Sequence, residues 1–215
     1  MVSEAKVFGL SIIIVDDGSD VFIETFLEKN EHIIIVRHPT NQGKGVALRS
    51  GAKQAQLMGF EYCLTMDGDG QHFSDDIPAF LALFEKEQNS NMIIIGVRDF
   101  ETCNPPKSSV IGRSLGNFWV WVETGTWVSD TQTGFRLYPV EFLLYPSSTL
   151  RYDFETENLV HFLWAGGTIF EVMVRTLYDD TRVTHFHKFK DNIFMIILHT
   201  KLVISRIFLL KGILK

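Results

Sequence analysis

The sequence has few of the residues that mark secreted, disulfide-linked proteins. Only two cysteines and six prolines occur in 215 residues. Cys63 and Cys103 lie in unlike contexts without CxxC spacing, and nothing near Met1 resembles a cleavable secretory signal. We therefore expect a reducing, cytosolic setting. At this length, with 46% hydrophobic residues, the chain suits one globular domain with a sizeable core and is short for two.

The sequence also lacks an uninterrupted hydrophobic run long enough to cross a membrane. Its most apolar stretch, residues 193–214, is broken by His199, Lys201, Arg206 and Lys211, whereas a spanning helix needs about 20 mostly apolar residues. Two interpretations stay open for this stretch. Either it packs against the domain's own core, or it lies in the bilayer interface with its basic side chains at anionic headgroups.

Acidic residues outnumber basic ones and give a formal net charge of −6, but the two signs are unevenly distributed. Residues 185–215 hold six basic residues and one acid, a formal charge of +5, so that residues 1–184 carry −11. This asymmetry indicates either that the C-terminal end meets an anionic partner or that it forms a solvated basic helix.

Short runs of β-branched and other apolar residues recur along the chain, and helical patterns separate them. The runs lie at 11–15, 32–36, 60–66, 92–96 and 168–174, and the helical patterns at 20–30, 44–58, 75–88, 109–124, 153–165 and 190–214. Continuous apolarity suits strands covered on both faces. The alternation predicts an α/β fold with a mostly parallel sheet, in which ligands bind outside the carboxyl ends of the strands.

The segment TMDGDGQHFSDDIP, residues 65–78, directly follows one of these strands and holds four aspartates. Its two glycines permit a tight turn on which the oxygens of Asp67, Asp69 and Gln71 can converge. Neighbouring carboxylates repel one another unless a cation neutralises them, and hard oxygen ligands suit Mg²⁺ or Mn²⁺. The segment therefore predicts a site for a divalent ion.

Three alternatives compete with this prediction. An EF-hand loop requires glycine at its sixth position and glutamate at its twelfth, where this chain has His72 and Pro78. A dehalogenase-type phosphatase also has an Asp-x-Asp after a strand, but that motif normally opens the fold, and here two strands precede it. Capping of the following helix explains Asp75 and Asp76 and leaves the preceding pair unexplained.

Two further segments have the composition of binding loops. In VDDGSD (15–20), Asp16 and Asp17 end a strand, where an acid can hold a sugar hydroxyl or a base edge. In NQGKGVALRSGAKQA (41–55), glycines and Lys44 open a helix whose backbone amides could face a phosphate. The spacing matches neither a Walker loop nor a dinucleotide fingerprint, so tight packing is the favoured reason for Gly43, Gly45 and Gly51.

Taken in order, VDDGSD, NQGKGVALRSGAKQA, MDGDGQH, GVR (96–98) and DTQTGFRLY (130–138) resemble the inverting glycosyltransferases of family two. The resemblance is to the bacterial branch related to dolichol-phosphate mannose synthase and other polyprenyl-phosphate glycosyltransferases, and it runs from about residue 11 to 192. It implies a GT-A fold over residues 1–192. Residues 193–215 would then form a basic, apolar helix associated with a membrane surface.

The resemblance implies roles on the side of the nucleotide-sugar donor, a UDP- or GDP-sugar. Asp16 and Asp17 would lie against the base or ribose, and Asp67 near the ribose and the metal. Asp69 and Gln71 would ligate the Mg²⁺ or Mn²⁺ that bridges the diphosphate. A metal there would stabilise the negative charge that develops on the leaving nucleoside diphosphate.

The resemblance also implies roles on the acceptor side. Arg98 and Arg113 stand where that branch holds the acceptor phosphate, because arginine forks onto phosphate oxygens; ordinary ion pairing is the alternative. A phosphate acceptor needs no general base. For a hydroxyl acceptor Asp130 would be the candidate base, with a turn-forming role as the favoured alternative. The segment THFHKFKD (184–191) resembles the basic residues that close over the diphosphate and points to Lys188.

Members of this family begin with a strand and a helix ahead of the strand that here starts at Ser11, roughly 30 residues by βαβ arithmetic. The sequence therefore predicts an N-terminally truncated sheet. Two functions stay open. One is a metal-dependent glycosyltransferase at the inner, cytoplasmic face of the cell membrane, acting on a polyprenyl phosphate or surface glycan. The other is a non-catalytic remnant that binds nucleotide weakly or serves as an interaction module. Neither function involves nucleic acid.

Overall fold

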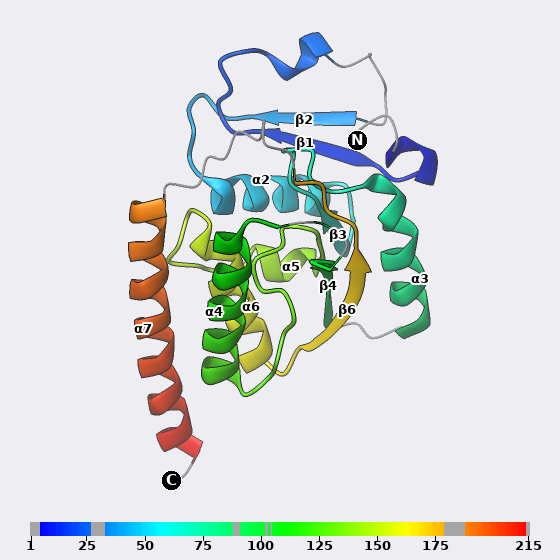
Figure 1. Ribbon diagram of the computed structural model, residues 1–215. Coiled ribbons are helices and arrows are strands. Elements are labelled where there is room, and N and C mark those ends of the chain that lie inside the picture. Colours follow the sequence, from blue (N-terminus) through cyan, green and yellow to red (C-terminus); the bar gives the residue numbers. More distant parts are fainter. Residues whose placement is uncertain are drawn as a thin grey trace.

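The computed structural model describes most of the chain as a mixed α/β fold with flanking helices (Figure 1). The described residues are 5–26, 33–87, 91–101, 103, 105–178 and 188–213. Within them, β1 (Ile12–Asp16) pairs in parallel with β2 (Ile33–Arg37). A second sheet has the order β3-β5-β4-β6, with β3 at Tyr62–Thr65, β5 at Arg136–Pro139, β4 at Met92–Arg98 and β6 at Thr168–Val174.

The strand directions confirm a mostly parallel architecture. In the four-stranded sheet β5 is antiparallel to both β3 and β4, while β4 and β6 are parallel to each other. β3, β4 and β6 therefore run in one direction and β5 alone is reversed. The five strands predicted from apolar runs are all present, whereas β5 was missed. Its four residues are all buried and include Arg136, so no apolar run marks it in the sequence.

The predicted helices are confirmed with one exception. The helices are α2 (Lys44–Leu57), α3 (Ile77–Glu87), α4 (Lys107–Thr124), α6 (Asp153–Trp164) and α7 (Lys188–Ile213); the short α5 (Val140–Leu143) was not predicted. The exception is the helix predicted at 20–30, where the described residues form only the 3₁₀ turn η2 (Ile23–Phe26). Val21, Phe22 and Phe26 are exposed, so the described part of this segment, residues 20–26, lacks the buried face that normally stabilises a helix.

The core lies on both faces of the four-stranded sheet. On one face Ile93 and Ile95 of β4 pack with residues of α6 and α7. On the other face Met92 and Ile94 pack with Phe80 of α3. Figure 1 shows α3 on one side of the sheet and α4, α6 and α7 on the other. Successive strand residues point to opposite faces, so the continuous apolar run of β4 is buried from both sides, as the sequence predicted.

Neither cysteine forms a disulfide. Cys63 and Cys103 are free thiols. Cys63 packs against the core cluster of α6, and burial raises the pKa of its thiol to about 12. Because the thiolate is the reactive form, Cys63 is an inert packing residue.

The glycines at the start of α2 permit a close approach to residues 150–154. The Gly45 amide donates a hydrogen bond to the Leu150 carbonyl at 2.9 Å. A Cβ atom at Gly43 would lie 2.6 Å from that carbonyl oxygen, and one at Gly45 would lie 2.6 Å from the Cβ of Phe154. Tight packing is therefore a sufficient reason for both glycines, and it seats Lys44, between them, against α6.

We expect Gly45→Ala to destabilise the fold. The added methyl group would overlap the Phe154 side chain, and overpacking of this kind costs about 1–3 kcal/mol, which in a chain of this size lowers Tm by roughly 2–12 °C. Thermal unfolding followed by circular dichroism measures the change. Gly68→Ala is the matched control, since a Cβ there has no atom within 4 Å. Equal Tm values for the two variants would contradict the packing argument.

Candidate functional site

The N-terminus of α2 collects acids from two strand ends. The amide of Gly43 donates a hydrogen bond to Asp17 Oδ2 at 2.8 Å, and Asp17 follows β1. The ammonium of Lys44 lies 2.8 Å from Asp67 Oδ1, and Asp67 follows β3. Three of the predicted donor-side residues are therefore brought to one helix end, at the carboxyl ends of the strands where α/β sheets bind ligands.

Lys44 is shared between two carboxylates. Besides Asp67 it contacts Glu155 Oε2 on α6 at 2.6 Å, and the second oxygen of Glu155 is buried without a hydrogen-bond partner. Burial acts to lower the pKa of Lys44, but the two carboxylates raise it above its ordinary value. Burial likewise acts to raise the pKa of Asp67, and Lys44 lowers it below the usual range. Lys44 and Asp67 are therefore both charged at neutral pH.

Asp16 and Asp17 both make contacts within the protein. Asp16 is buried, pairs with the guanidinium of Arg37 and accepts a hydrogen bond from the Ser19 amide at 2.9 Å. Asp17 Oδ1 lies 2.6 Å from Nδ1 of His38. These contacts fix the turn after β1. Their predicted contacts with the base or ribose stay predictions.

The remaining predicted metal ligands lie on the turn after β3. Asp69 is exposed, and its Oδ1 accepts a hydrogen bond from the Gln71 amide at 3.1 Å. The side-chain amide of Gln71 donates to the Leu177 carbonyl at 3.3 Å. Among the described residues, no three His, Cys, Asp or Glu side chains gather as a metal site.

The oxygen ligands of this turn fit Mg²⁺ or Mn²⁺ better than they fit a metal whose ligands all come from the protein. Mg²⁺ is commonly held by one or two carboxylates together with substrate phosphates and water, and Asp67 and Asp69 supply two carboxylates two residues apart. A Cβ placed at Gly68 or Gly70 would meet no atom within 4 Å, so the turn is open above its backbone. Asp67 is already neutralised by Lys44, which leaves Asp69 as the more accessible ligand.

A second cluster contains the predicted acceptor-side residues. Arg98 binds Asp130 through two parallel hydrogen bonds, Nε to Oδ2 at 2.8 Å and Nη2 to Oδ1 at 2.9 Å. Arg113 of α4 donates to the Arg98 carbonyl at 2.8 Å and lies 3.9 Å from Asp130 Oδ2. The structure thus brings all three together. Asp130 is completely buried, and both of its oxygens are occupied by Arg98, an arrangement that suits a positioning role more than that of a base.

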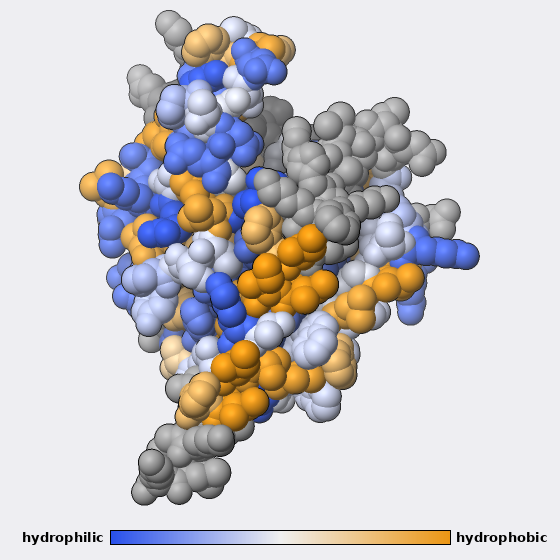
Figure 2. Space-filling model, turned by 90° about the vertical axis from the view of Figure 1, so that its left-hand side faces the viewer, coloured by the Kyte–Doolittle hydropathy of each residue, from blue (hydrophilic) through white to orange (hydrophobic). Residues whose placement is uncertain are grey.

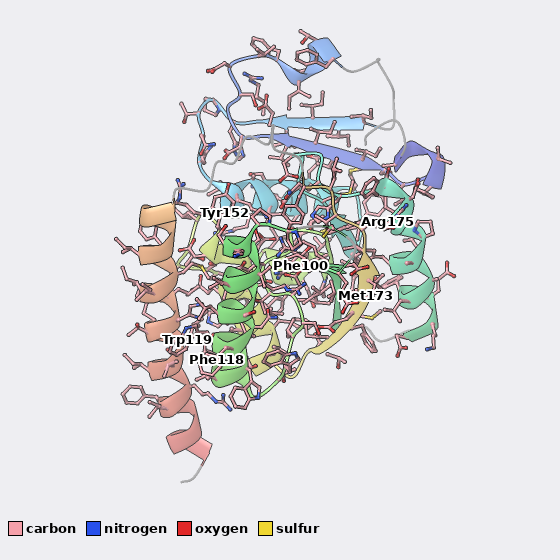
Figure 3. All side chains as sticks on the ribbon, in the orientation of Figure 1. Phe100, Phe118, Trp119, Tyr152, Met173 and Arg175 are labelled. Atoms are coloured by element: carbon pink, nitrogen blue, oxygen red, sulfur yellow. The ribbon has the colours of Figure 1, made fainter. Side chains whose placement is uncertain are left out.

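An aromatic side chain lies against both arginines. The Cζ atom of Arg113 is 3.6 Å from the centre of the Phe100 ring and that of Arg98 is 5.2 Å away. Tyr178, after β6, accepts a hydrogen bond from Arg98 at 3.3 Å. Figure 3 shows Phe100 between α4 and β6. Two guanidinium groups face one carboxylate here, so the cluster carries an excess positive charge that suits an anion.

The loop at residues 130–134 joins the two clusters. At one end Asp130 binds Arg98. At the other, a Cβ at Gly134 would lie 2.3 Å from Asp67 Oδ2, so this backbone touches the acidic turn. The loop is held from below by Arg136, which is fully buried and donates to the Thr133 and Thr131 carbonyls at 2.8 and 2.7 Å.

Sequence reasoning missed Arg136 as a residue of the site. Its signal was an arginine flanked by hydrophobic residues in GFRLY, because a charge can be buried among such residues only when its hydrogen bonds are satisfied. Residues 184–187, part of the predicted closing segment, lie outside the described residues. Lys188 begins α7, and its side chain also lies outside what the structure describes.

Comparison with known proteins agrees with the resemblance seen in the sequence. Residues 7–170 match the family described as Glycosyl transferase family 2. An uncharacterized protein of Methanocaldococcus jannaschii is 32% identical over 179 residues, which cover 79% of this chain and 71% of that protein. A UDP-N-acetylglucosamine–dolichyl-phosphate N-acetylglucosaminyltransferase of Methanococcus voltae is 27% identical over 192 residues, covering 79% and 76%. A dolichyl-phosphate beta-glucosyltransferase of Trichomonas vaginalis is 28% identical over 170 residues, covering 71% and 50%.

Proposed function

The chain belongs to glycosyl transferase family 2, and from this premise we propose that it transfers a sugar from a UDP- or GDP-sugar to a polyprenyl phosphate. Two relatives are named for transfer onto dolichyl phosphate. The observation that carries the proposal is the loop 130–134, which touches Asp67 at one end and binds Arg98 at the other. A donor and an acceptor bound at the two ends of this loop would be neighbours.

On the donor side, Asp69 and Gln71 would hold Mg²⁺ or Mn²⁺, with Asp67 beside them. The metal would supply charge neutralisation for the departing nucleoside diphosphate. Lys44 adds a second cation fixed at the N-terminus of a helix, where the backbone dipole also favours an anion. Electrostatic stabilisation fixed in advance in this way is the usual means of lowering the barrier for an anionic leaving group.

On the acceptor side, Arg98 and Arg113 would bind the lipid phosphate. Asp130 holds the Arg98 guanidinium in place through two hydrogen bonds, and Phe100 packs against both arginines. The two cations therefore keep their positions before the substrate arrives. A phosphate oxygen is already anionic at neutral pH, so attack on the sugar carbon needs no proton acceptor, which agrees with the full occupation of Asp130.

We expect the protein to bind UDP or GDP only with a divalent ion, and Asp69→Ala to abolish this binding. Asp69 is the exposed carboxylate of the turn, and without it the positive charge that holds the diphosphate is lost. Isothermal titration with nucleotide in Mn²⁺, repeated in EDTA, measures the effect.

Asp75→Ala is the matched control for that titration. Asp75 is an exposed acid of the same segment, 3.8 Å from Arg175, and its loss should leave the nucleotide affinity unchanged. No nucleotide binding by folded protein, with or without Mn²⁺, would overturn the proposed function and favour a non-catalytic interaction module.

A further inference from the structure

The outward face of α7 is apolar. Leu198, His199 and Leu202 are buried against the domain. The opposite face carries large exposed hydrophobic residues at the spacing of one helix face: Ile193, Ile196, Ile197, Ile204, Ile207 and Phe208. The surface helix of a soluble domain normally has polar residues on this face, and a helix that is hydrophobic all round is normally covered on all sides. We therefore expect a partner to cover the outer face of α7.

Helix α4 extends this apolar face. Its exposed hydrophobic residues are Val110, Ile111, Leu115, Phe118, Trp119 and Trp121, and Trp127 follows in the next loop. The two helices lie side by side, and the Trp119 ring stacks on His199 of α7 at 5.8 Å. Figure 2 faces this side of the molecule and shows hydrophobic residues gathered over it. We name the exposed apolar residues of α4 and α7, together with Trp127, the α4–α7 surface.

Polar contacts fix α7 in this orientation. Nδ1 of His199 lies 2.7 Å from Oε1 of Glu123, an α4 residue that is completely buried. Arg206 donates to the Val122 carbonyl of α4. The Trp164 indole of α6 donates to the Glu123 carbonyl at 2.9 Å. Because the His199 and Arg206 contacts lie on the inner side of α7, the isoleucines cannot turn inward without breaking them.

The exposed charges that the structure describes on α4 and α7 are all basic. Among the side chains of α4 and α7 that the structure describes, Glu123 is the sole acid, and it is buried. Lys107 and Lys201 are exposed, and Arg206 is half-buried. Tryptophans, apolar aliphatic residues and exposed lysines together are the composition of a surface that enters the interface of an anionic bilayer. No helix in the described part of the chain is long and apolar enough to span one.

We propose that the α4–α7 surface docks on the headgroup region of an anionic lipid bilayer, with α7 lying in the plane of the interface. This inference deepens the proposed function and rests on it for its biological purpose. Arg113 belongs to the same helix as Ile111 and Leu115, while its guanidinium points toward Arg98. Docking through α4 would bring the arginine cluster near the plane in which a polyprenyl phosphate holds its headgroup.

The test is co-sedimentation of the full chain with vesicles of phosphatidylcholine, with and without phosphatidylglycerol. We expect Ile204→Glu to lower the partition coefficient at least tenfold, because an exposed isoleucine that would enter the bilayer is replaced by an anion. Lys201→Gln should weaken binding about fivefold, and only to vesicles that contain phosphatidylglycerol. Brominated lipids should quench tryptophan fluorescence in the bound wild-type protein, since three of its four tryptophans are exposed on or beside the surface.

Leu57→Glu is the matched control. Leu57 is an exposed apolar residue at the end of α2, so this variant makes the same change of charge away from the α4–α7 surface and should sediment like wild type. Circular dichroism confirms that each variant is folded. The proposal would be overturned if the wild-type protein bound neither kind of vesicle, or if the two glutamate variants lost binding equally.

Light scattering tests whether a second copy of the chain, instead of a bilayer, covers the α4–α7 surface. A wild-type dimer that Ile204→Glu converts to monomer, without vesicle binding, would show that the surface pairs with a second copy and would overturn membrane docking. Failure of docking is distinguishable from failure of the proposed function. Transfer to a short, water-soluble polyprenyl phosphate tests the chemistry without a bilayer, and vesicle binding tests the surface without a sugar donor.

Discussion

Replacing Lys44 by methionine is expected to lower the free energy of unfolding by about 3–5 kcal/mol at neutral pH. The ammonium is the partner of both Asp67 and Glu155, and removing it leaves two carboxylates facing each other in a mostly buried site. Urea unfolding at pH 7 measures the loss. Lys53→Met is the matched control, because Lys53 lies on the exposed side of the same helix and should change stability by less than about 0.5 kcal/mol.

The loss of stability caused by Lys44→Met should become smaller as the pH falls. Lys44 holds the pKa of Asp67 below its usual range, so this pair stabilises the wild type fully above the unfolded aspartate pKa of about 4. The contribution falls as the pH drops through the folded pKa. In the variant, the largest cause that lowers the pKa of Asp67 is gone and burial still acts to raise it, so protonation of Asp67 at acid pH relieves the variant first. The difference between the two proteins should therefore narrow from pH 7 to pH 4, and a constant difference would contradict the ion pair.

Arg113→Ala is expected to reduce kcat/KM for a polyprenyl phosphate about 100-fold. The loss of one charge-assisted hydrogen bond to a phosphate, at about 1.5–3 kcal/mol, supports a loss of this size. The nucleotide affinity should not change, because Arg113 contacts Arg98 and Asp130 and none of the donor-side residues. Initial rates at varied acceptor concentration, combined with nucleotide titration, separate the two effects.

Two further variants serve as controls for the effect of Arg113→Ala. Arg113→Lys keeps the charge without the planar fork and should recover part of the lost rate. Arg175→Ala removes a half-exposed arginine whose side chain pairs with Asp76, and it should leave the acceptor kinetics unchanged. If Arg113→Ala weakened nucleotide binding as strongly as acceptor use, the separation of the site into two clusters would be wrong.

The sequence was most informative where the signals are local. The run MIIIG predicted β4 because a strand covered on both faces is apolar throughout, and the structure buries Met92–Val97 completely. Glycines around Lys44 were attributed to packing, and their missing side chains do make room for Leu150 and Phe154. By contrast, β5 was missed, because an arginine interrupts its apolar pattern and the backbone carbonyls that accept the hydrogen bonds of Arg136 cannot be identified from the sequence.

The acids lie where the sequence placed them, but some of their partners differ from those predicted. Asp67 lies at the end of a strand as expected, but the cation next to it is Lys44 of the chain itself, 23 residues away. Asp130 forms the turn that the sequence favoured, through its hydrogen bond from the Gln132 amide at 3.2 Å, and it also neutralises Arg98, 32 residues away. Ligation of a metal by Asp69 and Gln71 stays a prediction.

By itself the sequence determined the order of strands and helices, the turns that carry the acids and glycines, and the family. Hydrophobic periodicity, turn residues and segment order act over a few residues and can be read along the chain. Only the tertiary structure decided which charges neutralise one another and which apolar helix face is left uncovered. Both depend on distances between segments far apart in the chain, and a one-dimensional pattern does not record which face of α7 meets the core.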